Sequence, residues 1–309
     1  MPSSALAVNV AGIDFQNPIL LAAGTAAYGR ELSRVIDLDR LGGLVTKAVS
    51  VERRHGAPAP RVAEFEGGMI NAVGLANPGA EEVRAKHLPW LAENLHRAKV
   101  IVNVVGSRVE DFATVVTMLD DAKGFDGYEL NVSCPNVKAG GMEFGADPQS
   151  LRELVTRVRA ATRRPIFVKL SPTLTDIAQT ARVATDAGAD GISVVNTMPG
   201  LVIDVDSRKP VLGFGSGGVS GPGLLPVGVL ATYKAAKAVK VPIVGVGGIG
   251  KATDIVQYIM AGASLVAIGT AAMQQPRLST RLVDELERWC ENHDVKSLTE
   301  LRGTVQWDR

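Results

Sequence analysis

Cysteine and histidine are scarce in this sequence, which limits the metal and disulfide chemistry open to it. The 309 residues include two cysteines, Cys134 and Cys290, and four histidines. Two cysteines are too few for a disulfide framework, and they cannot supply the four thiolates of an ordinary iron–sulfur cluster. The histidines fall in expected loops or on helix faces rather than in strands, so a metal lacks a ligand set. The sequence therefore predicts no bound metal, and any iron–sulfur cluster would have to lie on another subunit.

Runs of one charge and long apolar stretches are missing as well. Lys and Arg together number 33 and Asp and Glu 32, a formal net charge of +1, with no basic stripe interleaved with aromatic residues. Nucleic acid is therefore not an expected partner. The apolar stretches are interrupted before the ~20 residues of a spanning helix, and the N-terminus has no basic region ahead of its apolar residues. We expect a soluble, cytoplasmic protein without a membrane segment.

What the sequence does contain is an alternation of short apolar runs and longer amphipathic segments, which is the pattern of a β/α protein. Eight runs are strand candidates: Pro18–Ala23, Leu44–Val49, Val100–Val105, Tyr128–Val132, Pro165–Leu170, Gly191–Asn196, Pro242–Val246 and Leu265–Gly269. The helical patterns are Glu81–Ala98, Val109–Asp121, Pro148–Thr162, Thr175–Ala187, Leu224–Val239, Ala252–Met260 and Arg277–Asn292. Asp147 directly before Pro148 predicts an N-cap followed by proline at the first helical position.

The number and composition of these strands favour a closed (β/α)8 TIM barrel. Strands that are apolar throughout suit a parallel sheet covered on both faces, and eight strands with crossover helices close a barrel. An open doubly wound sheet would normally carry its phosphate-binding glycines after the first strand, whereas the glycine pairs here follow the seventh and eighth. We therefore predict a single domain over residues 1–309 with an N-terminal hairpin at Ala7–Asn17. Insertions at Ser50–Pro78 and Met198–Gly223 are expected to build an active site or an interface.

Polar residues stand where the strands end, which is the rim that carries the chemistry of barrel enzymes. They are Ala23-Gly24-Thr25, Lys47, Asn103, Asn131 with Cys134, Lys169, Asn196-Thr197, Gly247-Gly248 and Gly269-Thr270. Buried lysines and asparagines need partners, so we expect this set to converge on a polar ligand. A salt bridge across the rim is the alternative for the two lysines. The glycine pairs suit a phosphate, of a substrate or of FMN, held by backbone N–H groups, and two tight turns are the plainer alternative.

Cys134 and Cys290 differ in their expected surroundings. Cys134 follows the fourth strand in a loop whose glycines, within Gly140–Gly145, could hinge a lid. A lone cysteine is more often a small buried apolar residue, and no histidine lies nearby in sequence to activate a nucleophile. Cys290 lies inside the last helix and is predicted to serve packing.

Several motifs in matching order give the chain a resemblance to a known enzyme family. They are Asn71-Ala-Val-Gly-Leu75-Ala-Asn-Pro78, Glu129-Leu-Asn131-Val-Ser-Cys134-Pro-Asn136, Val168-Lys169-Leu-Ser-Pro172, Asn196-Thr197 and the two glycine pairs. Together they resemble the dihydroorotate dehydrogenases of class 1, which use a cysteine, and the resemblance runs from Pro18 to Thr270. The extension Val137-Lys-Ala-Gly-Gly-Met142-Glu-Phe-Gly145 is more similar to the NAD-linked class 1B catalytic subunit than to the fumarate-linked class 1A.

The resemblance implies an FMN lying across the barrel mouth. Its phosphate would bind Gly247, Gly248, Gly269 and Thr270, with Gly221 nearby. Its ring would meet Ala23, Lys47, Ala48, Asn103, Asn131, Lys169 and Val195. The family usually has a serine at the position of Ala23, so a side-chain hydrogen bond is lost there while a backbone contact would survive.

The resemblance also implies a substrate and a reaction, the oxidation of dihydroorotate to orotate in pyrimidine biosynthesis. Dihydroorotate would stack on the flavin, held by Lys47, Asn71, Ala72, Val73, Gly74, Leu75, Asn131, Asn196 and Thr197. Cys134 would take a proton from C5 as general base while hydride passes from C6 to the flavin. Lys169 would stabilise the anion left on the reduced ring.

A second subunit would then take up the electrons. In class 1B it carries FAD and a [2Fe-2S] cluster and uses NAD, and the expected assembly is a heterotetramer of two catalytic and two partner chains around a homodimer core. This sequence has neither the cysteines nor the dinucleotide-binding glycine pattern for those steps. The alternatives are a class 1A enzyme, another pyrimidine-reducing flavin barrel, and a flavin-free phosphate-binding barrel acting as an isomerase or lyase.

Overall fold

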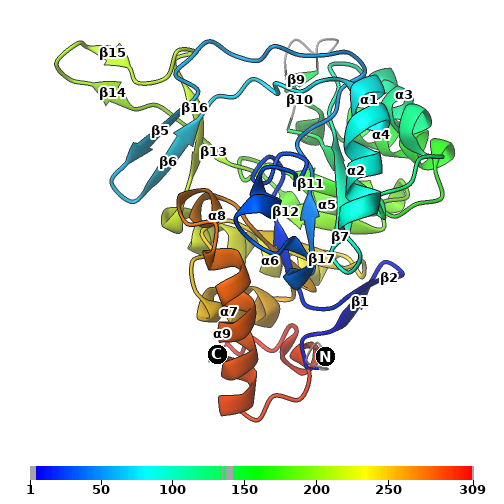
Figure 1. The fold of residues 1–309 in the computed structure, drawn as a ribbon, viewed down its shortest axis with the longest axis vertical. Coiled ribbons are helices and arrows are strands. Elements are labelled where there is room, and N and C mark those ends of the chain that lie inside the picture. The colour runs from blue at the N-terminus through cyan, green and yellow to red at the C-terminus, as the bar shows by residue number, and fades with distance from the viewer. Residues whose placement is uncertain (1–4, 134, 137–141, 308–309) are drawn as a thin grey trace.

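The computed structural model of the chain describes residues 5–133, 135–136 and 142–307. Its centre is a closed barrel of parallel strands in the order β11-β12-β17-β18-β3-β4-β7-β8 (Figure 1). The strands are β3 (Ile19–Leu21), β4 (Gly43–Val45), β7 (Lys99–Val104), β8 (Gly127–Asn131), β11 (Ile166–Leu170), β12 (Gly191–Val194), β17 (Ile243–Val246) and β18 (Leu265–Ile268). The predicted (β/α)8 barrel is confirmed.

The barrel strands are buried on both faces, which explains their apolar sequences. One cluster of buried side chains fills the interior and includes Leu20, Val45, Ile101, Phe167 and Leu265. Other residues of the same strands face outwards and join the helices in a larger buried cluster. A strand covered on both sides has no solvent face, so its sequence does not alternate between apolar and polar residues.

Helices surround the barrel (Figure 1). They are α1 (Ala80–Glu82), α2 (Leu88–Asn94), α3 (Val109–Leu119), α4 (Pro148–Ala161), α5 (Ile177–Asp186), α6 (Leu225–Ala238), α7 (Ala252–Ala261), α8 (Thr270–Gln274) and α9 (Leu278–Asn292). Short 3-10 turns occupy Leu32–Arg34, Leu38–Arg40, Phe144–Ala146, Pro222–Leu224 and Leu298–Leu301. The N-cap predicted at Asp147 is confirmed, because its carboxylate accepts a hydrogen bond from the backbone N–H of Ser150 at 2.9 Å. No helix among the described residues is both long and apolar enough to cross a membrane.

The helix predicted over Glu81–Ala98 is divided in the structure. A π-helical turn, Val83–His87, separates α1 from α2, and α2 ends at Asn94. Pro89 at the start of α2 has no N–H to donate one turn back, which accounts for the altered turn before it. Strand β4 is also shorter than the predicted Leu44–Val49, although the chain continues beside β7 through the hydrogen bond from the N–H of Val49 to the C=O of Asn103 at 2.8 Å.

The predicted N-terminal hairpin and the two predicted insertions cover the two ends of the barrel. The N-terminal hairpin is confirmed as β1 (Val8–Val10) paired with β2 (Ile13–Phe15), and its apolar side chains join the cluster inside the barrel. The two insertions combine into one antiparallel sheet, in the order β13-β16-β6-β5. Its strands are β5 (Val62–Phe65), β6 (Gly68–Asn71), β13 (Met198–Gly200) and β16 (Gly217–Ser220).

Two further strand pairs lie in the connecting loops. β14 (Ile203–Asp204) and β15 (Lys209–Pro210) form a hairpin that projects from the molecule beyond the inserted sheet (Figure 1, upper left). β9 (Pro135–Asn136) pairs with β10 (Met142–Glu143) in the loop after β8. These pairs lie outside the barrel wall, so they shape its surroundings and not its closure.

Candidate active site

A cavity of about 410 Å³ lies at the carboxyl ends of the barrel strands and extends under the inserted sheet. Every predicted site residue that the structure describes lines it, from the rim and from the insertions alike: Ala23, Lys47, Ala48, Asn71, Ala72, Val73, Gly74, Leu75, Asn103, Asn131, Lys169, Val195, Asn196, Thr197, Gly221, Gly247, Gly248, Gly269 and Thr270. Cys134, the predicted base, lies outside the described residues. The structure thus brings the predicted residues to one place, while their individual roles stay predictions.

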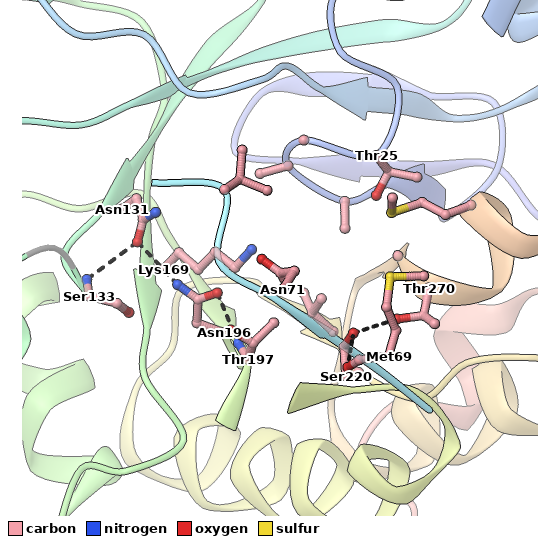
Figure 2. A pocket seen from close by; sticks show the side chains of 18 of the residues that line it. Thr25, Met69, Asn71, Asn131, Ser133, Lys169, Asn196, Thr197, Ser220 and Thr270 are labelled. Carbon is pink, nitrogen blue, oxygen red and sulfur yellow. Dashed lines mark hydrogen bonds between the residues drawn. The ribbon is translucent and has the colours of Figure 1, made fainter. Parts of the chain in front are cut away.

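One end of the cavity is bounded by turns that only glycine fits well. Gly247 and Gly248 follow β17 with φ of 125° and 72°, a region that side chains with a Cβ rarely adopt. A Cβ at Gly248 would lie 2.4 Å from the backbone nitrogen of Leu225. Opposite them, the hydroxyl of Thr270 donates to that of Ser220 at 2.7 Å (Figure 2). This end therefore offers backbone and hydroxyl groups within a close-fitting cradle, which suits a phosphate.

The other end is a network of side-chain amides. The Oδ1 of Asn131 accepts from the Nδ2 of Asn196 at 3.2 Å, and the Oδ1 of Asn196 accepts from the backbone N–H of Thr197 at 2.9 Å (Figure 2). The Nδ2 of Asn71 donates to the backbone C=O of Gly218 at 3.2 Å. These bonds fix the direction in which each amide presents its donor and its acceptor. Such an arrangement suits a ligand with both N–H and C=O groups around a ring.

Two lysines bring positive charge to the cavity. Lys169 is the last residue but one of β11, is 7% exposed, and points its amine into the open middle of the cavity (Figure 2). Neither Lys169 nor Lys47 forms a salt bridge within the described part of the chain, so the predicted alternative of an ion pair across the rim has no partner there. Burial lowers the pKa of Lys47, and the nearby charge of Arg61 lowers it further. Two cations without a protein carboxylate leave the cavity suited to an anionic ligand.

Several residues that line this cavity were not predicted from the sequence. Val62, Met69 and Ser220 come from the inserted sheet, and Met273 comes from α8. Thr25 stood among the rim residues without a role, and Ser133 lies inside the Asn-x-Ser-Cys motif, so both had a signal in the sequence. The residues of the sheet had none, because their position depends on how two distant insertions pair.

A second cavity of about 330 Å³ adjoins the first and shares Asn71, Asn196 and Thr197 with it. Its distinguishing residue is Glu143, whose carboxylate accepts a hydrogen bond from the hydroxyl of Ser171 at 3.4 Å. Burial raises the pKa of Glu143, and the bond from Ser171 opposes that shift. The described residues contain no group of three or more His, Cys, Asp or Glu side chains arranged to hold a metal ion.

Comparison with known proteins places this chain in a family. The family model for dihydroorotate dehydrogenase matches residues 5–289. The chain belongs to the dihydroorotate dehydrogenase family. The family resemblance predicted from the motifs is thereby confirmed.

The similar proteins extend over nearly the whole chain. The dihydroorotate dehydrogenase B (NAD(+)) catalytic subunit of Pelobacter propionicus is 44% identical over 301 residues, covering 97% of this chain and 98% of the relative. The protein of the same name from Alkaliphilus metalliredigens is 45% identical and covers 96% of this chain and 98% of its own length. A putative dihydroorotate dehydrogenase A (fumarate) from Solibacter usitatus is also 45% identical, with 98% and 99% covered.

The cavity fits the flavin that the family implies. Gly247 and Gly248 line the cavity as backbone without side chains, and at Gly248 the turn is packed so closely on the backbone of Leu225 that a Cβ would clash with it. Asn103 lines the cavity with a buried Oδ1 that has no hydrogen-bond partner among the described residues. A buried carbonyl oxygen of this kind calls for an N–H donor, and an isoalloxazine ring carries one. The donor and acceptor set therefore agrees with FMN.

Proposed function

We propose that this chain is the catalytic subunit of an NAD-linked dihydroorotate dehydrogenase, which oxidises (S)-dihydroorotate to orotate in pyrimidine biosynthesis. The observation that carries the proposal is that one cavity collects the amides, the lysines and the glycine cradle expected of the family. The relatives named as B-type catalytic subunits support the NAD-linked form. The relative named as a putative fumarate-linked enzyme keeps class 1A as the second candidate.

The cofactor of the proposal is FMN. Gly247, Gly248, Gly269 and Thr270 would hold its phosphate, with Gly221 nearby, and the ring would lie against the residues of the cavity wall: Ala23, Lys47, Ala48, Asn103, Asn131, Lys169 and Val195. When bound, FMN supplies a two-electron acceptor that takes up hydride from carbon. The buried ammonium of Lys169 places a fixed positive charge in the cavity, and such a charge stabilises negative charge that develops during the reaction.

The substrate would occupy the amide end of the cavity. Lys47 offers a cation to the carboxylate of dihydroorotate, and Asn71, Asn131 and Asn196 offer oriented amides to its ring. Ala72–Leu75 line the same region with Thr197. Because each amide is held by a neighbour, the ligand meets donors and acceptors already in place, which lowers the cost of ordering them on binding.

Cys134 is the proposed general base. A thiol has an ordinary pKa of about 8.5, so a modest downward shift makes it a workable base near neutral pH. As thiolate it would accept the proton from C5 of dihydroorotate. The amide network around Asn131 and Asn196 would meanwhile hold the substrate ring in position.

A separate partner subunit would take up the electrons from this chain. The phrase "catalytic subunit" in the names of the relatives supports a separate electron-transfer chain. We propose that it carries FAD and a [2Fe-2S] cluster, in a heterotetramer of two catalytic and two partner chains around a homodimer core. A cytoplasmic location and one domain over residues 1–309 complete the proposal.

One experiment separates the proposal from its rivals. The chain is purified, its visible spectrum is recorded, and dihydroorotate is added without oxygen. We expect a yellow protein with an FMN spectrum that bleaches on addition. A yellow protein that does not respond would indicate a different pyrimidine-reducing flavin enzyme, and a colourless protein that takes up no FMN would indicate a flavin-free barrel.

A further inference from the structure

Glu129 is a buried carboxylate that has no role in the proposed reaction. It lies on β8 inside the barrel, with Asn103 of β7 beside it on one side and Phe167 of β11 on the other. Only 3% of Glu129 is exposed. A buried charge is costly unless it is hydrogen-bonded. The Oε1 of Glu129 accepts a hydrogen bond from the Nδ2 of Asn103 at 2.8 Å.

This bond decides which way round Asn103 holds its amide. A carboxylate can only accept, so the NH2 group of Asn103 must face Glu129 and its carbonyl oxygen must point elsewhere. The backbone of Asn103 is fixed as well. Its N–H donates to the Oγ1 of Thr46 at 3.2 Å, and its C=O accepts from the N–H of Val49 at 2.8 Å. The backbone of Asn103 and the NH2 group of its side chain are thus both held in place.

The carbonyl oxygen of Asn103 is left free for a ligand. Asn103 is 1% exposed, lines the cavity, and has no partner for its buried Oδ1 in the described part of the chain. Leaving such an oxygen unsatisfied is unfavourable, and a ligand N–H would satisfy it. The oxidised isoalloxazine ring has a single N–H among several acceptors. An inverted amide would therefore present a donor where the N–H of the ring needs an acceptor.

We propose that Glu129 is a positioning residue of the flavin site, which holds the amide of Asn103 with its carbonyl oxygen turned to the cavity to accept the ring N–H of FMN. The inference rests on the proposed FMN site. It assigns Glu129 an effect on flavin binding that passes through Asn103 and not through contact with the ligand.

The test is a double-mutant cycle on FMN affinity. The full-length chain is freed of flavin, and the Kd for FMN is measured by quenching of flavin fluorescence. The parent is compared with Asn103→Ala, Glu129→Leu and the double variant. Each single change should raise the Kd for FMN about tenfold, which corresponds to ~1.4 kcal/mol of binding free energy. The double variant should bind within about twofold of Asn103→Ala alone, because Glu129 has no effect once the amide is gone.

Controls separate positioning from damage to the barrel. Glu129→Gln keeps the size of the side chain, and it should show a smaller loss that also disappears without Asn103, since an amide supports both orientations of its neighbour. Ser193→Ala changes another buried polar side chain of the barrel strands and should leave FMN affinity within about twofold of the parent.

Two results would overturn the inference. One is that Glu129→Leu and Glu129→Gln both bind FMN with a Kd within twofold of that of the parent. The other is a pair of losses that multiply in the double variant, which would mean that Glu129 acts independently of Asn103. Failure of the parent itself to bind FMN would instead overturn the proposed function.

Discussion

At the scale of the residue, Cys134→Ser tests the proposed base. Serine is nearly the same size, so bound FMN and orotate affinity should stay close to those of the parent. Its hydroxyl is a far weaker acid, so the form that accepts a proton is scarce near neutral pH. Flavin reduction by dihydroorotate, followed by anaerobic stopped flow, should slow by about 10² to 10⁴-fold. The rate should recover partly as pH rises, with a larger isotope effect from deuterium at C5.

Cys290 supplies the matched control for that experiment. It is 1% exposed in α9, and burial raises the pKa of its thiol, followed by the charges of Glu287 and Glu291. Cys290→Ser should therefore leave the rate of flavin reduction unchanged. A parent-like rate in Cys134→Ser at every pH would remove Cys134 from the role of base.

The charge on Lys47 sets a second prediction, on pH. Burial and the nearby Arg61 lower the pKa of Lys47, so this amine loses its charge at a lower pH than an exposed lysine does. Orotate is an anion, and its affinity should fall as pH rises through that lowered pKa, by up to about tenfold per pH unit. In Arg61→Gln the pKa of Lys47 rises, so the loss of affinity should begin at a higher pH. Titrating the flavin spectrum with orotate across the alkaline range measures this shift.

Arg61 also holds the inserted loop, so its replacement acts on the loop as well as on the pKa of Lys47. Its guanidinium donates to the backbone C=O of Ala57 and of His55, each at 2.7 Å. Loosening of the loop would weaken the binding of orotate equally at all pH values. The effect of charge changes only the pH at which orotate affinity begins to fall, which is the alkaline limb of the pH profile. Arg53→Gln, an exposed change on the same insertion, should leave that limb where it is in the parent. An unmoved limb in Arg61→Gln would mean that Lys47 does not govern binding.

At the scale of the element, the turn after β17 depends on glycine. Gly248 has a φ of 72°, and a Cβ there would lie 2.4 Å from the backbone nitrogen of Leu225. Gly248→Ala should lower the free energy of unfolding by about 1–3 kcal/mol through backbone strain. It should also reduce the FMN retained on purification, because the cradle must shift. Urea unfolding and flavin content measure the two effects.

Gly250 lies two residues further on and makes a close control. A Cβ there would meet only the Oδ2 of Asp254, at 3.9 Å, and its φ is not positive. Gly250→Ala should change the free energy of unfolding by no more than about 0.5 kcal/mol. Equal stability and flavin content in Gly248→Ala and Gly250→Ala would show that the cradle tolerates a side chain.

At the scale of the whole molecule, the electrons have to leave the barrel. The chain has two cysteines, too few for an iron–sulfur cluster of its own. The isolated chain should therefore oxidise dihydroorotate with artificial acceptors and reduce NAD hardly at all. Steady-state assays with a dye, NAD and fumarate in parallel distinguish the cases. Rapid NAD reduction by the pure chain would contradict the need for a partner, and rapid turnover with fumarate would indicate class 1A.

Much of this architecture could be predicted because it is encoded locally. Each barrel strand is an apolar run of a few residues, and all but β3 are followed by a helix before the next barrel strand or the end of the chain. These patterns depend only on neighbours in sequence. The strand ends then follow, since parallel strands place their carboxyl ends on one rim. For this reason the sequence identifies Lys169, Asn196 and the glycines after β17 as rim residues.

The inserted sheet was decided by the tertiary structure alone. Its strands β6 and β16 join segments that are far apart in sequence, as shown by the hydrogen bond between Asn71 and Gly218, which are 147 positions apart. The strands are short and carry no clear apolar period, so nothing local predicts that they pair. Only the closed barrel brings the two insertions over the same rim. Met69 and Ser220 reach the cavity for that reason. The orientation of the Asn103 amide also depends on tertiary structure, because Glu129, to which it donates, lies on the neighbouring strand of the barrel.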